Sequence, residues 1–233
     1  MPHSSLDSFF FANSGSEAVE AALKMVRGIT RKQNIVTMQG AFHGRTFGAM
    51  AVTKSKTIYA DGSSPLMVRP FSPSSHQPYL TCGTPVILQP GVVTAPFPYW
   101  HHFNSVPGAD DAELVRASLY QLELLLLQQS APSDTAAVII EPVLGEGGYV
   151  PAPPAFLQGL RDICDKNGLL LIIDEVQSGF GRTGRIFNIE YSGVRPDLLI
   201  MAKVGPTSCF FARRDVVPEC LNYIIGPCKW IPA

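Results

Sequence analysis

The sequence predicts an α/β domain with a mostly parallel sheet, because short apolar runs alternate with amphipathic segments and several runs end in polar residues. The clearest run, Leu169–Ile173, is followed by Asp174 and Glu175. Such a run is typical of a buried strand covered on both faces. Ligands of open α/β sheets bind beyond the carboxyl ends of the strands, so we expect the functional site there. Asp174 either caps a loop or pairs with an arginine, or it holds the positive nitrogen of a ligand.

Composition narrows the class of protein. The 233 residues are 46% hydrophobic and 16% charged, with a net charge of -1, which suits a globular chain with one sizeable core. We expect no nucleic-acid partner, because this net charge does not indicate the excess of basic residues that nucleic-acid-binding surfaces carry. We expect no membrane partner, because no apolar run approaches the roughly 20 residues of a span. The five cysteines contain no CxxC and the five histidines show no metal spacing, so no disulfide framework or metal site is predicted.

The first predicted unit is a strand, a small polar loop and a helix. Phe9–Phe11 is a short apolar run, and the apolar spacing from Val19 to Val26 fits a helix. Ser14 or Ser16 can cap that helix, and Gly15 lets its backbone approach a ligand. The loop is therefore either an ordinary helix cap or a phosphate site.

A second strand is expected over residues 34–38, followed by a glycine-punctuated loop and a helix over residues 47–52. Phe42 lies in that loop between Gly40 and Gly44, so its ring belongs to the core or forms a stacking surface for a planar ligand. Residues 61–100 show no periodicity, and such a long structureless connection is unusual within a compact domain.

The second half repeats the alternation of strand and helix. We expect helices over residues 110–129 and 153–167, the second with proline in its first turn and Gly168 at its end. Strands are expected over residues 136–140 and 196–202, besides the central one. A loop with two carboxylates and three glycines follows the first of these, and Lys203 stands at the end of the second.

Four motifs thus lie at strand ends: residues 14–18, residues 42–46, residues 141–148, and Asp174–Gln177 with Lys203. Their order and spacing resemble the class III (omega-amino-acid) aminotransferases, over residues 9–67 and 90–203. The run at residues 174–184 with Met-Ala-Lys about 20 residues later is the most specific part. The resemblance implies the large domain of a fold type I transferase that depends on pyridoxal phosphate (PLP). The small domain is expected to be largely missing.

The resemblance also implies roles for the residues. Lys203 would form the Schiff base with the PLP aldehyde and then move the proton, and Asp174 would pair with the pyridine nitrogen. Other cofactor contacts are implied for the phosphate (Gly15, Ser16), for the two ring faces (Phe42 with His43 beside it, and Val176 below), for the phenolic oxygen (Gln177) and for the ring edge (Glu141). Glu146 resembles the carboxylate that pairs with a substrate-selecting arginine, and Arg182 is interpreted as structural.

The implied reaction is a two-step transamination, in which an omega-amino acid or amine gives its nitrogen to PLP and a 2-oxo acid takes it back. The implied assembly is a homodimer. No secretory signal is read at the start of the sequence, so we expect the cytosol or the mitochondrion, without choosing between them.

Domain boundaries follow from where the resemblance holds. We expect a PLP-binding domain over residues 1–203, with residues 68–89 as a loop-like insertion, and a tail over residues 204–233 without the family pattern. Our hypothesis is that these two extra segments are translated introns or gene-model errors. We expect transaminase activity to be impaired in the chain as given.

Two alternatives stay open, and a third lacks the motif that it requires. An inactive fragment that only binds PLP or only dimerises fits the same motifs, and so does a class III mutase or decarboxylase. A P-loop NTPase also has an apolar run ending in Asp-Glu, but it needs a Gly-Lys-Ser or Gly-Lys-Thr loop, and the sequence contains neither tripeptide.

Overall fold

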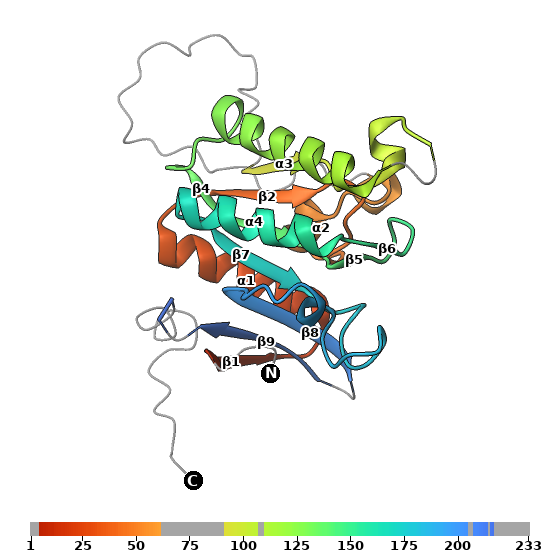
Figure 1. The fold of residues 1–233 in the computed structure, drawn as a ribbon. Coiled ribbons are helices and arrows are strands. Elements are labelled where there is room, and N and C mark those ends of the chain that lie inside the picture. The colour runs from red at the N-terminus through yellow and green to blue at the C-terminus, as the bar shows by residue number, and fades with distance from the viewer. Residues whose placement is uncertain (1–4, 62–90, 107–109, 205–206, 214, 217–233) are drawn as a thin grey trace, which may run out of the picture.

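The structure is a computed structural model that describes residues 5–61, 91–106, 110–204, 207–213 and 215–216 (Figure 1). The expected insertion at residues 68–89 and the part of the expected tail beyond residue 216 lie outside the described residues. The described chain forms one seven-stranded sheet and a small hairpin. The hairpin pairs β5 (Val143–Leu144) with β6 (Val150–Pro151).

The large sheet has the order β1-β9-β8-β7-β4-β2-β3. Neighbours from β8 to β3 pair in parallel, and β9 runs antiparallel to both β8 and β1. The prediction of an α/β fold with a mostly parallel sheet is therefore confirmed. The strands are β1 (Leu6–Ala12), β2 (Asn34–Met38), β3 (Val92–Ala95), β4 (Thr135–Ile140), β7 (Leu170–Asp174), β8 (Leu198–Val204) and β9 (Thr207–Arg213).

Helices cover both faces of this sheet. Figure 1 shows α4 (Pro154–Asn167) in front of the sheet, beside α3 (Asp111–Gln128), and α1 (Gly15–Thr30) behind it; α2 (Phe47–Val52) packs beside α1. Adjacent strand residues face opposite layers, so Ile172 packs in the α1 layer and Ile173 in the α4 layer. Two buried faces explain the unbroken apolar runs, and each fully buried large side chain contributes about 1.5–3 kcal/mol.

Single turns of 3₁₀ helix connect these elements, and caps set the helix ends. The turns are η1 (Thr57–Tyr59), η2 (Trp100–Phe103) and η3 (Asn188–Tyr191). Ser14 is the residue that caps α1, since its Oγ accepts a hydrogen bond from the Glu17 amide at 3.3 Å. Gly168 ends α4 in the left-handed conformation, with φ 62°, as expected from the sequence.

The sheet continues beyond Lys203, where the sequence analysis ended the domain. We did not predict β9, because it lies in the segment over residues 204–233 that we expected to be a tail without the family pattern, directly after a Gly-Pro pair. Its side chains alternate: Phe210 and Ala212 pack in the α1 layer, whereas Cys209 and Phe211 lie against the opposite layer. The strand places β8, which carries Lys203, in the interior of the sheet rather than at its edge.

A buried carboxylate ties β9 to the rest of the fold. Asp197 accepts hydrogen bonds at 2.7 Å from the Arg161 guanidinium of α4, the Arg213 guanidinium of β9 and the Leu171 amide of β7. Its side chain is buried, so both of its oxygens need these donors. Three elements distant in the sequence are thereby fixed to one side chain.

Candidate functional site

The carboxyl ends of β1, β2, β4, β7 and β8 meet at one edge of the sheet and surround a cavity of about 230 Å³. All ten site residues predicted from the sequence line this cavity. The structure therefore has a cavity at the edge of the sheet where we expect ligands to bind. The lining residues are Ser14, Gly15, Ser16, Phe42, His43, Gly44, Glu141, Gly145, Glu146, Tyr149, Asp174, Val176, Gln177 and Lys203.

A buried carboxylate–imidazole pair forms one wall. Asp174 ends β7, and its Oδ2 lies 2.7 Å from Nδ1 of His43. Its Oδ1 accepts a hydrogen bond from the Val176 amide at 3.0 Å. Nε2 of His43 is buried and has no hydrogen-bond partner among the described residues. The pair fixes the orientation of the carboxylate and leaves one buried nitrogen unsatisfied, which is costly without a ligand or water.

Glu141, directly after β4, joins the two loops beside the cavity. One carboxylate oxygen accepts a hydrogen bond from the Phe42 amide at 2.8 Å, and the other accepts one from the Gly145 amide at 3.0 Å. Burial raises the pKa of this carboxyl from 4.5 to about 7; the neighbouring His43 opposes the rise and Asp174 adds to it. Glu141 therefore titrates near neutral pH.

The start of α1 forms another wall. The first amides of an α-helix have no partner within the helix, so the N–H groups of Gly15 and Ser16 are open to an anion. A side chain at Gly15 would press on Val176, whose methyl groups would lie 3.2–3.3 Å away. A side chain at Gly44 would meet Ser16 Oγ at 2.3 Å. Two glycines thus keep a shallow cradle open around Ser16.

Lys203 lies where the pairing of β8 with β9 shifts register, between Met201 and Val204. Its backbone is left-handed, with φ 64°, which costs a residue with a side chain about 1–3 kcal/mol. Such irregularities re-aim a side chain. The ammonium group donates a hydrogen bond to Gln177 Oε1 and faces the cavity with it.

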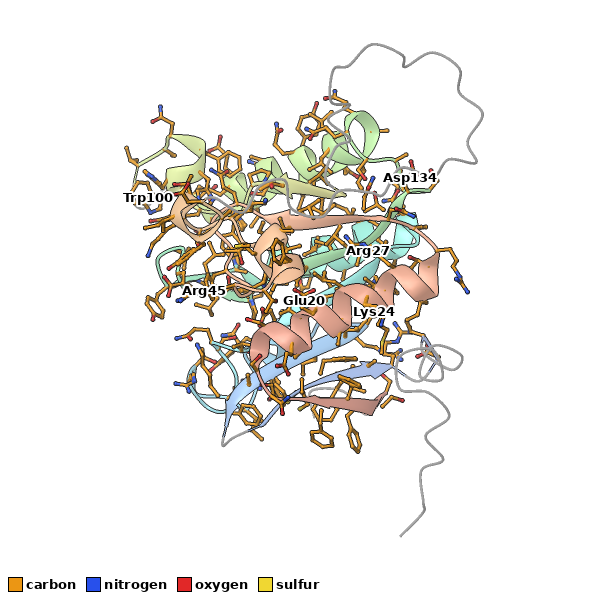
Figure 2. All side chains as sticks on the ribbon, turned by 180° about the vertical axis from the view of Figure 1, so that it is seen from behind. Glu20, Lys24, Arg27, Arg45, Trp100 and Asp134 are labelled. Carbon is orange, nitrogen blue, oxygen red and sulfur yellow. The ribbon has the colours of Figure 1, made fainter. Side chains whose placement is uncertain are left out.

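The mouth of the cavity carries a cluster of aromatic and charged groups. Phe42 packs edge-on against Tyr59, with ring centroids 5.1 Å apart. Glu146 Oε2 accepts hydrogen bonds from Lys56 Nζ at 3.1 Å and from the Tyr59 hydroxyl at 3.0 Å. Those two hydrogen bonds, the one from Lys56 first, lower the pKa of Glu146. The Arg45 guanidinium, labelled in Figure 2, lies over both aromatic rings.

The two carboxylates of the Asp-Glu pair have different surroundings. Glu175 is fully buried and faces away from the cavity, accepting hydrogen bonds from the Ser178 hydroxyl at 2.5 Å and the Ile189 amide at 2.7 Å. It holds the segment after β7 in place. Arg182 is exposed and lies outside the cavity lining, with a guanidinium contact of 3.5 Å to the Lys203 carbonyl oxygen.

Sequence reasoning missed three residues at or beside the mouth of the cavity: Lys56, Tyr59 and Tyr149. The first two follow the helix expected over residues 47–52, in a stretch to which the sequence analysis assigns no motif, and only the contact with Glu146 connects them to the site. Tyr149 follows two glycines, which gave a signal for a turn but none for the direction of its ring.

Within the described ranges, no group of three His, Cys, Asp or Glu side chains could hold a metal ion. No helix in the same ranges has the length and apolar character needed to cross a bilayer.

Comparison with known proteins shows the family of this chain. The profile of the family described as Aminotransferase class-III matches residues 1–221, so the chain belongs to the class III aminotransferase family. It is 39% identical over 198 residues to the acetylornithine aminotransferase of Methanosarcina mazei, covering 85% of this chain. It is 39% identical over 191 residues to the 4-aminobutyrate aminotransferase GabT of Escherichia coli, covering 82% of this chain. The resemblance read from the four motifs is therefore confirmed.

The fold also matches solved structures. A taurine:2-oxoglutarate aminotransferase from Bifidobacterium kashiwanohense, solved in complex with PLP and glutamate, aligns with a TM-score of 0.75 and 27% identity. That alignment covers 96% of this chain and 46% of the other. The chain spans 38% and 37% of the lengths of the two curated relatives named above.

The class III family is PLP-dependent, and the residues of this cavity fit that cofactor. The unsatisfied His43 nitrogen lies beside a buried acid, the cradle around Ser16 is closed to any residue larger than glycine at Gly44, and a lysine amine faces the same space. PLP has a basic ring nitrogen, an anionic phosphate and an aldehyde, which complement these three features.

Proposed function

We propose that this cavity binds PLP and serves a transaminase that moves an amino group from an omega-amino acid or amine to a 2-oxo acid. The observation that carries the proposal is that one cavity joins Lys203, Asp174 and the N-terminus of α1. These groups come from β8, β7 and the loop after β1, so the fold rather than the local sequence brings them together.

Asp174 would hold the ring end of the cofactor. Its carboxylate is already oriented by His43 and by the Val176 amide, so binding needs no reorganisation of this group. A carboxylate at this position favours a proton on the pyridine nitrogen. When bound, PLP supplies an electron sink for the substrate carbon next to the transferred nitrogen.

Lys203 would act as the amine that holds the cofactor and as the base for proton transfer. Its ammonium group is exposed and contacts Gln177, so a substrate can reach it. After release from the cofactor, Lys203 Nζ would accept the proton of the substrate carbon and return it to the cofactor side. The α1 amides of Gly15 and Ser16 would hold the phosphate, and Phe42 and Val176 would contact the ring faces.

The partners proposed are an amino donor, a 2-oxo acid and a second copy of the chain. Large exposed side chains at Phe47 and Ile58, on elements next to the cavity mouth, support an interface there. Sedimentation of the purified chain checks the homodimer, and a monomer at micromolar concentration would contradict it.

Reductive labelling tests the cofactor proposal. The purified chain is incubated with PLP, treated with borohydride, digested and mapped. We expect the phosphopyridoxyl group on the peptide containing Lys203 and its loss in Lys203→Ala. Lys24→Ala removes an exposed lysine of α1 and should keep the label, and adding an amino donor before borohydride should decrease it. Equal labelling of Lys203→Ala and the unsubstituted chain would refute the proposal.

A further inference from the structure

Tyr149 is carried by a fixed turn at the rim of the cavity. It lies between β5 and β6, in a left-handed conformation with φ 57°. The amides of Gly148 and Tyr149 both donate to the Gly145 carbonyl, at 3.1 and 3.2 Å. The backbone of the turn is thus held while the side chain is 70% exposed. A large aromatic ring on a fixed backbone is a surface against which a ligand can pack.

Tyr149 also separates the site from two neighbouring grooves. One groove, of about 390 Å³, is lined by Tyr149 together with Gln177 and Arg182, among others. The other, of about 490 Å³, contains Trp100, labelled in Figure 2, and also reaches Tyr149. Among the described residues, Tyr149 is the one that lines the site cavity and both of these grooves.

The site cavity is small, so the position of Tyr149 between it and the two grooves affects how much space a substrate has. At about 230 Å³ it is smaller than the roughly 300–1,000 Å³ typical of ligand pockets. A cofactor held between Asp174 and the start of α1 leaves little room for a second molecule. The side chain of an amino donor must therefore extend outward, past the hairpin that carries Tyr149.

We propose that Tyr149 is a specificity-determining residue, whose ring limits the size of the amino donor's side chain. This inference rests on the proposed function, because it concerns the substrate of the same site. Truncating the ring would join the site cavity to the two grooves and admit a bulkier donor. A hydrophobic pocket discriminates between sizes by about 10- to 200-fold for each added group, which sets the scale of the effect.

Binding of stable conjugates tests the proposal without any turnover. Phosphopyridoxyl conjugates are made by reducing PLP with ethylamine and with phenethylamine, and their dissociation constants are measured by equilibrium dialysis. We expect the unsubstituted chain to prefer the ethyl conjugate by at least about tenfold. Tyr149→Ala should lower this preference about tenfold by binding the phenethyl conjugate more tightly, whereas Tyr149→Phe should keep it.

Two further variants control for indirect effects. Tyr149→Gly removes the ring and suits the left-handed backbone, so it should shift the preference as alanine does without strain. Tyr120→Ala removes an exposed ring of α3 outside these three cavities and should leave the preference unchanged.

The outcomes separate this inference from the proposed function. An unchanged preference in both Tyr149→Ala and Tyr149→Gly, with conjugates still bound, overturns the role of Tyr149 alone. Failure of the unsubstituted chain to bind PLP and the ethyl conjugate overturns the proposed function and this inference with it.

Discussion

Replacing Glu141 with glutamine should change how the stability of the fold depends on pH. The carboxyl of Glu141 is 3% exposed, and its burial raises its pKa from 4.5 to about 7. A difference of about 2.5 pKa units corresponds to about 3 kcal/mol, at 1.36 kcal/mol for each unit. That is a substantial part of the 5–15 kcal/mol by which domains are typically stable.

The direction of this pH dependence follows from whether the folded or the unfolded chain binds the proton of Glu141 more tightly. Below pH 4.5 the carboxyl is neutral in the folded and the unfolded chain, so it adds no pH dependence. Between pH 4.5 and 7 the unfolded chain ionises while the folded chain keeps the proton, and the free energy of unfolding therefore falls as the pH rises. Above pH 7 the loss is complete, at about 3 kcal/mol.

Glutamine at position 141 has no proton to lose, but its amide nitrogen cannot accept a hydrogen bond, so one of the two backbone amides of Phe42 and Gly145 loses its acceptor. We expect Glu141→Gln to be less stable than the unsubstituted chain by about 1–3 kcal/mol near pH 5, and this difference to shift in favour of the variant by about 2–3 kcal/mol between pH 5 and pH 8. Urea denaturation followed by tryptophan fluorescence at several pH values measures both proteins, and their difference cancels the groups that titrate alike.

A matched control is Glu146→Gln, which removes an exposed carboxylate of the same site. Hydrogen bonds lower the pKa of Glu146 from its ordinary value of 4.5, so its carboxylate is largely ionised in the folded and the unfolded chain above about pH 5.5 and should add little slope from there to pH 8. A stability difference between Glu141→Gln and the unsubstituted chain that stays constant over that range would refute the reasoning.

Two more predictions concern the framework. Asp197→Ala leaves two partly buried guanidinium groups without their buried partner, so it should lower the free energy of unfolding in urea by about 3–5 kcal/mol. Asp165→Ala removes an exposed carboxylate of an ion pair and should lower it by under about 1 kcal/mol. Equal losses in the two variants would contradict the role given to the buried carboxylate. Gly44→Ala should cost about 1–3 kcal/mol and weaken PLP binding, because φ is +131° and the new methyl group meets Ser16. Gly28→Ala, in open space on α1, should instead stabilise by about 0.5–1 kcal/mol in the same assay, and a destabilised Gly28→Ala would show that the chain does not tolerate such changes in general.

Much of the fold was accessible from the sequence because local patterns and burial agree. The run before Asp174 predicted a strand with two covered faces, and β7 has helices on both sides. Gly168 was expected to end a helix, and it does so in the left-handed conformation.

The position of β9 was not accessible, because register and neighbour choice are set by distant residues. Cys209 pairs with Met201 on one side and with Phe11 on the other, and nothing near Cys209 in the sequence indicates either partner. Residues 204–233 were expected to lie outside the domain, so the apolar residues 209–212 within β9 predicted no strand.

The candidate site, like the fold, could be predicted from the sequence only in part. Motif spacing was enough to gather the lining residues, since the ends of parallel strands share one edge. It could not show that Glu141 bridges two loops, or that Glu175 faces away from the cavity, because the partners of both are fixed only in the folded chain. Hydrogen-bond partners far apart in the sequence leave no local pattern.

The interior position of β8 has a consequence for synthesis. The lysine strand acquires its second neighbour only when β9, about 200 residues after β1, has formed and has itself paired with β1. A ribosome releases the helix start at Gly15 long before it releases Lys203, and contacts between such distant segments form slowly. The anion cradle and the amine therefore come together late, after translation of the intervening chain, so a cofactor can enter only after this sheet has formed.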